Sequence, residues 1–369
     1  MGKSVLIHIM KSKKRWLAVG VSLAVLLAIV ALFVLSIFLS YSFGLATGER
    51  RLAEFSDSVT GHVLNKRSAQ YPNSESVDFD AFWKTWALLD EKYADFPVGT
   101  STDVINAMEA EVRRIEAKYS RYREDSVLSD INQRAGQAVG LDKETLWLIN
   151  YACACFEQSE GLFDISSGVL RQAWDFRAGQ LPAEAALARL LPLIGLSRVE
   201  ISEAHLTMPP DMELDLGGIG KEYAVDAAAA IARQAGITCG VIDLGGDLCV
   251  LGPHEDGSPW QLGVRNPRDT ENAIATLPVY QGGMASSGDY ERFFEKDGKR
   301  YCHLLNPESG FPVDYWASVT VVAPSCLLAG TLSTIAMLKE ASGEGWLRAQ
   351  DVNALLIRPD LSVLSLTGR

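Results

Sequence analysis

Apolar positions run without a charged residue from 16 to 48, close to the start of the chain. This run exceeds the roughly 20 apolar residues that cross a bilayer as a helix. The segment before it carries lysine and arginine but no acidic residue, which keeps that end in the cytoplasm. A cleaved signal peptide is the alternative, because residues 43–48 include small side chains, but its apolar core is about 7–15 residues long. We therefore favour an uncleaved anchor.

The same pattern divides the chain into segments. We expect a cytoplasmic basic segment at 1–15, a transmembrane signal anchor at 16–40, a linker at 41–54 and one folded domain at 55–369. A single large domain is ordinary at this length.

Within the domain, apolar residues recur first at helical and later at strand-like spacing. Helices are expected at residues 79–93, 103–119, 143–158, 184–191 and 221–235. Strands are expected at residues 59–64, 199–201, 238–244, 260–264, 273–279, 317–323 and 354–357. Early helices followed by strands predict an α+β or mixed α/β fold.

Composition excludes one class of partner and leaves the cysteines open. Hydrophobic residues make up 48% of the chain and charged residues 22%, which fits a globular body. The net charge is -12 and no basic run follows the N-terminus, so we expect no nucleic-acid partner. The six cysteines form no CxxC pair and are interpreted as buried small hydrophobes, with a disulfide as the alternative outside the cytoplasm.

Three glycine-rich segments, at 215–226, 243–248 and 282–294, could bring the backbone close to a ligand. The first precedes a predicted helix, whose N-terminus favours an anion, and Lys221 adds a cation there. Each segment taken alone is also explained as a turn. His303 stands before the polar turn Asn306-Pro307-Glu308-Ser309-Gly310 and is a candidate for proton transfer, although single histidines are often structural.

Taken together and in order, these segments resemble the bacterial ApbE-like FAD:protein FMN transferase family. The matching blocks are SRYREDSVLSDIN, GLFDISSGVLRQAWDF, DLGGIGKEYAVD, DLGGDL, WQLGVRNP, SSGDYERFF, HLLNPESG and CLLAGTLSTIAM, spread over residues 120–337.

The resemblance implies an α+β fold with mixed sheets and flanking helices around a central FAD cleft, beside the N-terminal transmembrane helix. It implies transfer of FMN from FAD onto a Thr or Ser of a membrane or periplasmic redox protein, with release of AMP. It also implies magnesium and a single-pass protein of the bacterial inner membrane, with a cytoplasmic N-terminus and a periplasmic body. The FMN-accepting redox protein and the membrane are the implied partners.

The resemblance also assigns residues. His303 matches the proton-transfer position, and Gly220, Thr334 and Glu222 are the candidate metal-contacting residues. The candidate cofactor-binding residues are Asp215, Lys221, Tyr223, Ser287, Gly288, Asp164 and Trp174. Asp164 could equally be a cap, and Tyr223 and Trp174 could equally be packing residues.

Three positions depart from the family pattern. Gly330 stands where the family has a metal-binding aspartate, Glu222 where it has a glycine, and Asn306 where it has an aspartate. Loss of the aspartate should weaken magnesium binding, and a Gly330→Asp substitution is expected to raise it. Glu222 could repel phosphate or replace the missing ligand. An active transferase with a rearranged metal site, a degenerate relative that binds FAD as an assembly or redox partner, and an unrelated anchored binding protein all remain open.

Overall fold

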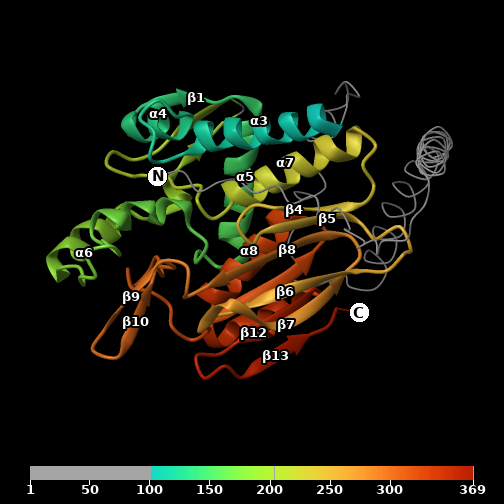
Figure 1. Cartoon of the computed structure of the whole chain (residues 1–369). Coiled ribbons are helices and arrows are strands. Elements are labelled where there is room, and N and C mark those ends of the chain that lie inside the picture. The colour runs from blue at the N-terminus through green and yellow to red at the C-terminus, as the bar shows by residue number, and fades with distance from the viewer. Residues whose placement is uncertain (1–100, 203, 369) are drawn as a thin grey trace, which may run out of the picture. The chain divides into compact units, whose positions relative to one another are not determined.

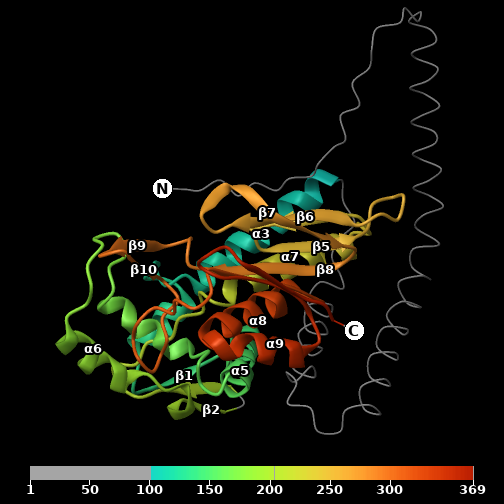
Figure 2. The same ribbon diagram turned by 90° about the horizontal axis from the view of Figure 1, so that it is seen from below.

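The computed structural model describes residues 101–202 and 204–368. The α-helices within them, shown in Figures 1 and 2, are α3 (Ser101–Tyr119), α4 (Val127–Gln133), α5 (Lys143–Gln158), α6 (Glu184–Leu190), α7 (Gly220–Gln234), α8 (Cys326–Leu338) and α9 (Gly343–Gln350). Four of them, α3, α5, α6 and α7, confirm helices that the apolar spacing predicts. The helix predicted at 79–93 and the strand predicted at 59–64 lie outside the described residues.

The strands of the described chain form one large sheet and three small ones. The strands are β1 (Ala138–Gly140), β2 (Glu200–Ile201), β3 (His205–Thr207), β4 (Gly240–Asp243), β5 (Leu248–Gly252), β6 (Trp260–Asn266), β7 (Asp269–Val279), β8 (Gly282–Gly288), β9 (Phe293–Lys296), β10 (Lys299–Cys302), β11 (Ser318–Ala323), β12 (Asn353–Ile357) and β13 (Val363–Leu366). The six-stranded sheet has the order β13-β12-β11-β8-β5-β4, beside β1-β3-β2 and the hairpins β6-β7 and β9-β10.

The prediction of an α+β fold is therefore confirmed, with one correction. The strands pair antiparallel in all four of these sheets, so they are not mixed in direction. Hairpin turns join several successive strands, and such short turns allow only antiparallel neighbours.

The two faces of the large sheet are covered by different elements (Figures 1 and 2). Strand β12 shows this by alternation, since successive side chains point to opposite faces. Leu355 and Ile357 pack with residues of the β6-β7 hairpin, whereas Ala354 and Leu356 belong to the main core. Helix α8 packs on β8 and β11, and α7 packs on β4 and β5, so these two helices cover the second face.

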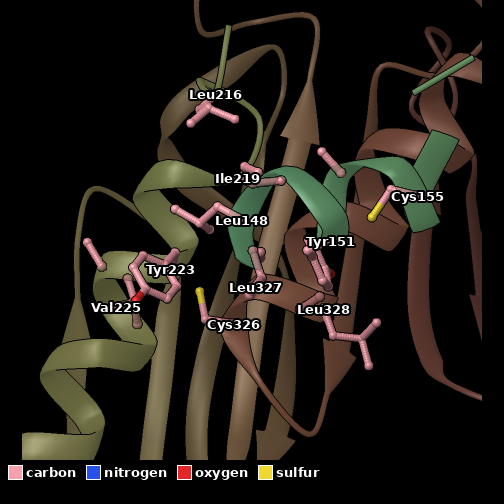
Figure 3. Packing of buried hydrophobic residues seen from close by; sticks show 14 of the residues in the cluster. Leu148, Tyr151, Cys155, Leu216, Ile219, Tyr223, Val225, Cys326, Leu327 and Leu328 are labelled. Atoms are coloured by element: carbon pink, nitrogen blue, oxygen red, sulfur yellow. The ribbon is translucent and has the colours of Figure 1, made fainter. Parts of the chain in front are cut away.

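Helices α3 and α5 close the main core over α7 and α8. Helix α3 lies along α7 (Figure 1). Helix α5 brings Leu148 and Tyr151 against side chains of α7 and α8 (Figure 3). The hydroxyl groups of Tyr151 and Thr331 on α8 are 2.9 Å apart. One continuous apolar core therefore holds the helices and the sheet in register.

The start of α8 is fixed by a carboxylate from α7. Asp226 accepts hydrogen bonds from the backbone N–H groups of Cys326 and Leu327, each at 2.9 Å. Ser325 adds a cap by accepting from Leu328 N at 3.2 Å. The first N–H groups of a helix have no partner within it, and a carboxylate also interacts favourably with the helix dipole. Asp226 is thus a cap that ties α7 to α8.

Helix α8 and strand β8 were not among the predicted elements, and both have a physical reason. Nearly every side chain of α8 is buried, so the sequence lacks the polar face that marks an amphipathic helix. Strand β8 has the sequence GGMASSG, whose composition is typical of a loop. Its glycine is needed for close packing, because a Cβ at Gly283 would lie 2.1 Å from Cys326 N.

The cysteines are buried or partly exposed thiols without disulfide partners. All six cysteines are free, and Cys155, Cys249, Cys302 and Cys326 are buried, as the small-hydrophobe interpretation predicts. Within residues 101–202 and 204–368, no helix has the length and apolarity to span a bilayer. The predicted anchor at 16–40 lies outside those residues, as do the segments 1–15 and 41–54.

We predict that Gly283→Ala destabilises the protein by about 1–3 kcal/mol, because the added methyl group forces β8 and α8 apart. Gly345→Ala is the matched control. A Cβ at Gly345 on α9 meets no atom within 4 Å, so that change should be neutral or stabilise by up to about 1 kcal/mol. Chemical denaturation of both variants measures the difference, and equal stability of the two would contradict the close-packing role.

Candidate functional site

The glycine turn before α7 exposes the helix N-terminus. Leu216 O accepts hydrogen bonds from Ile219 N and Gly220 N, and the helix begins at Gly220 without a side-chain cap. A Cβ at Gly220 would meet no atom within 4 Å, and its φ is not positive, so the backbone conformation does not require glycine. The absent side chain instead leaves open space beside an uncapped helix N-terminus, an arrangement that suits an anionic group.

Asp215 lies at the beginning of this turn and is paired with an arginine from another segment. It forms an ion pair with Arg121, and it accepts a hydrogen bond from Gly217 N at 2.8 Å. Arg121 also donates to the hydroxyl of Tyr122 at 2.8 Å, and the Arg292 guanidinium is 3.4 Å from the same oxygen. Arg121 and Arg292 are therefore brought together from distant parts of the sequence.

His303 follows the β9-β10 hairpin and adjoins these arginines. Its backbone N–H donates to Arg292 O at 3.0 Å. Its Nδ1 atom is buried and has no hydrogen-bond partner among the residues that the structure describes. Burial, together with the charges of Arg292, Arg121 and Lys221, lowers the pKa of His303 to about 4. The imidazole is therefore neutral at pH 7 and able to accept a proton.

Lys221 joins the site from the first turn of α7. Its Nζ is 2.6 Å from Asp247 Oδ2, in the turn between β4 and β5. Burial opposes the charge of Lys221, but the carboxylates of Asp247 and Glu222 outweigh it and raise the lysine pKa. Glu222 is only 8% exposed, and burial, followed by the charge of Asp247, raises its carboxyl pKa well above the usual value. Two buried carboxylates thus share one lysine.

Glu222 also contacts α8 at the position where the family pattern is broken. A Cβ added at Gly330 would lie 2.6 Å from Glu222 Cγ and 3.0 Å from its Oε1. Thr334, four residues further on, is on the same side of α8. Its hydroxyl is 2.9 Å from that of Ser287 on β8, which also contacts Ser333 at 2.8 Å. The structure therefore brings Glu222, Ser287 and Thr334 to the same region of α8.

Gly288, next to Ser287, is buried and packs tightly. A Cβ there would lie 2.2 Å from the ring of Tyr290. Its glycine is explained by packing, and a cofactor contact through its backbone stays a prediction.

The remaining predicted residues are occupied with structural partners. Asp164 caps the 3-10 helix Ile165–Gln172 by accepting from Ser166 N at 2.7 Å, and it also accepts from Leu196 N at 3.1 Å. Both of its oxygens are used within the chain, which favours the cap over the cofactor contact.

Trp174 and Tyr223 are packing residues in this structure. Trp174 donates to Gly310 O at 2.8 Å and stacks on Phe176. Tyr223 is 0% exposed and its hydroxyl donates to Glu144 at 2.8 Å. Its ring stacks on Trp147 of α5 and belongs to the main core (Figure 3). A flavin could touch Tyr223 only if α5 and α7 separated, so the packing alternative is favoured for both aromatics.

Asn306 makes a turn in place of the family's aspartate. Its Oδ1 accepts from Glu308 N at 2.8 Å and Ser309 N at 3.2 Å. An asparagine and an aspartate stabilise such a turn alike. The departure at 306 therefore leaves the local backbone intact.

Sequence reasoning missed Arg121, Arg292 and Asp247. Each lies within a segment that matches the family, but none stands out by spacing. In the described part of the chain no three His, Cys, Asp or Glu side chains group closely enough to hold a metal ion. The predicted magnesium site therefore depends on a carboxylate combined with hydroxyl and carbonyl oxygens, and stays a prediction.

The chain is similar to known proteins over much of its length. A family model described as the ApbE family matches residues 84–356. A Haemophilus influenzae protein named FAD:protein FMN transferase is 30% identical over 249 residues, which cover 64% of this chain and 72% of that protein. One of the same name from Vibrio cholerae is 28% identical over 277 residues, covering 72% of this chain and 83% of that protein.

Solved structures show the same similarity in three dimensions. The ApbE protein of Thermotoga maritima matches with a TM-score of 0.67 and 30% identity, over 73% of this chain and 90% of that one. The flavin transferase ApbE of Vibrio cholerae matches with a TM-score of 0.66 and 26% identity, over 74% of this chain and 91% of that one.

We predict that His303 titrates near pH 4 in the protein without FAD. Because this folded-state pKa lies below the ordinary 6.5, the unfolded chain binds the proton more tightly, and stability should fall as the pH drops from 6.5 to 4. Arg292→Gln should raise the His303 pKa by removing a positive charge. NMR titration of histidine-labelled protein measures both, with His303→Gln to assign the signal. A midpoint at or above 6.5 would contradict the cationic surroundings.

Proposed function

Because this chain belongs to the ApbE family, we propose that it is an FAD:protein FMN transferase. It transfers FMN from FAD to a Thr or Ser hydroxyl of a membrane or periplasmic redox protein and releases AMP. The observation that carries the proposal is His303, a neutral imidazole among Arg121, Arg292 and Lys221, whose buried Nδ1 has no partner in residues 101–202 and 204–368. The negative charge of a bound pyrophosphate would offset the cations that lower the His303 pKa, and so would bring the imidazole nearer to the range of a general base.

Different residues of the site have different roles in the transfer reaction. Arg121, Arg292 and Lys221 offset the negative charge of the FAD pyrophosphate, and the uncapped N-terminus of α7 adds backbone N–H groups. The acceptor hydroxyl attacks the phosphorus of the FMN half while His303 takes its proton. The bond from that phosphorus to the bridging oxygen breaks, and AMP leaves with the electron pair. Alignment of the attacking hydroxyl, the phosphorus and the leaving oxygen provides a further part of the rate enhancement.

The residues present also fit a divalent cation. Glu222 Oε2 is a buried oxygen that accepts no hydrogen bond from an N–H or O–H group among the described residues, and the Glu222 side chain lies against α8, which carries Thr334. Glu222, the Thr334 hydroxyl and the Gly220 carbonyl form an all-oxygen donor set of the kind magnesium prefers. When bound, the ion would neutralise phosphate charge.

A second candidate function follows from Gly330, which stands where the family has a metal-binding aspartate. In that alternative the chain binds FAD as an assembly or redox partner without transferring FMN. The match to the family model excludes the alternative of an unrelated binding protein. The two candidate functions differ in one observable result: only a transferase attaches flavin covalently to an acceptor protein.

We predict that the full chain, in detergent with FAD and magnesium, labels a threonine-containing acceptor flavoprotein with covalent flavin. His303→Gln should lower the rate by about 10²–10⁴-fold with little change in FAD affinity, because it removes the base and leaves the cations. In-gel flavin fluorescence measures transfer, and flavin quenching measures binding. His254→Gln, at a histidine stacked on Trp260, is the matched control and should transfer normally. FAD binding without transfer in the native chain would support the alternative function.

We further propose that residues 16–40 anchor the protein in the bacterial inner membrane, with residues 1–15 in the cytoplasm and the body in the periplasm. The charge-free run after a basic segment supports this topology. Protease added to spheroplasts is expected to degrade the body while intact cells protect it. Protection in spheroplasts would refute a periplasmic body, and a body freed into the periplasm would refute the uncleaved anchor.

A further inference from the structure

Glu222 and Gly330 occupy complementary positions on two facing helices. A Cβ at Gly330 would stand 2.6 Å from Glu222 Cγ and 3.0 Å from Glu222 Cδ. These separations are shorter than any that a side chain at 330 could tolerate without moving Glu222. The Glu222 side chain from α7 thus fills the space over α8 that a side chain at 330 would otherwise take.

The Glu222 carboxylate is buried beside a second carboxylate with one cation between them. Asp247 is 3% exposed and Glu222 8% exposed, and Lys221 Nζ lies 2.6 Å from Asp247 Oδ2. One lysine balances one of the two carboxylates, so the cluster keeps a negative charge if both are ionised. A buried charge without compensation costs several kcal/mol. Either a proton or a further cation must therefore complete the cluster.

The atoms around Glu222 include the oxygen ligands that a divalent cation would bind. Glu222 Oε2 accepts no hydrogen bond from an N–H or O–H group among the described residues, so either a cation or a proton shared with Asp247 must compensate its charge. Thr334 lies one turn beyond Gly330 on the same side of α8, and Ser287 contacts its hydroxyl at 2.9 Å. The polar atoms that meet here are mainly oxygens, which are the ligands of hard divalent cations.

We propose that Glu222 is the carboxylate ligand of a divalent cation, reaching from α7 across the bare backbone of Gly330 toward Thr334, with Asp247 as the adjacent buried charge. This inference rests on the proposed function, since the cation would serve the FAD phosphates. The substitution to glycine at 330 and the glutamate at 222 are then one rearrangement, in which the charge moves from one helix to the other while its position in space is retained.

The inference reverses the expectation that Gly330→Asp alone strengthens magnesium binding. The new side chain would collide with Glu222 and displace the existing ligand. Only the paired change, Glu222→Gly together with Gly330→Asp, removes the collision and keeps one carboxylate. The two positions should therefore be strongly coupled in a double-mutant cycle.

The test measures Mn²⁺ binding by electron paramagnetic resonance, using the full chain in detergent with and without FAD. Glu222→Gln should weaken Mn²⁺ binding by at least about tenfold, because it keeps the volume of the side chain and removes its charge. Glu116→Gln, at an exposed glutamate of α3, is the charge control and should bind normally. Gly330→Asp should weaken binding, and the double variant should recover most of it.

Flavin quenching and covalent transfer are recorded for the same samples. Loss of Mn²⁺ affinity in Glu222→Gln, with FAD binding retained, supports the inference. Unchanged Mn²⁺ affinity in Glu222→Gln overturns it and leaves the transferase function standing if flavin is still transferred. A native chain that binds no Mn²⁺ also overturns it, in favour of a proton shared by Glu222 and Asp247. Mn²⁺ binding through Glu222 without FAD binding would keep the cation site and reject the proposed function.

Discussion

The contact between α7 and α8 is the constraint on which the site depends. Asp226 of α7 accepts from the first N–H groups of α8, and Gly283 lets β8 approach the same helix start. These two features fix the distance and the rotation of α8 relative to α7. Because Glu222 is one turn before Asp226, the same arrangement sets its carboxylate against Gly330. The capping interaction therefore positions the site although it takes no part in the chemistry.

The candidate base is neutral and lies among cations, two of which are themselves paired with carboxylates. Arg121, Arg292 and Lys221 lower the pKa of His303, whereas Glu222 and Asp247 raise that of Lys221. A cationic histidine at this place would be useless as a base and would compete with the arginines for phosphate. Keeping it neutral by burial and by neighbouring cations leaves proton transfer and phosphate binding to different groups.

The sequence predicts what depends on local pattern. Helices α3, α5 and α6 were predictable because each has a polar side. Helix α7 is buried almost all round, but its run of alanines has a high helix propensity. Lys221 and His303 were predictable because they stand beside turns.

What the sequence does not predict depends on tertiary contacts. Helix α8 is apolar on all sides and β8 is composed of small residues, so their identity is decided by burial and by close packing. Contacts between distant segments bring three further residues to the site, and the pattern within any one segment does not predict this. They are Arg121, Arg292 and Asp247. Tyr223 shows the opposite error, since its place in a matching motif suggested a ligand contact while its ring lies in the core.

Two departures from the family pattern, Glu222 and Gly330, must be interpreted together because they lie against each other. Considered singly, Gly330 removes a ligand and Glu222 adds an unwanted negative charge near phosphate. Considered together, a glutamate at 222 fits only because no side chain projects from 330. A buried carboxyl group costs stability unless its charge is compensated, and Glu222 is beside a second buried carboxyl group, that of Asp247, with Lys221 as their common cation. The two departures therefore fit the rearranged cation site that we propose, in which the carboxylate reaches α8 from α7.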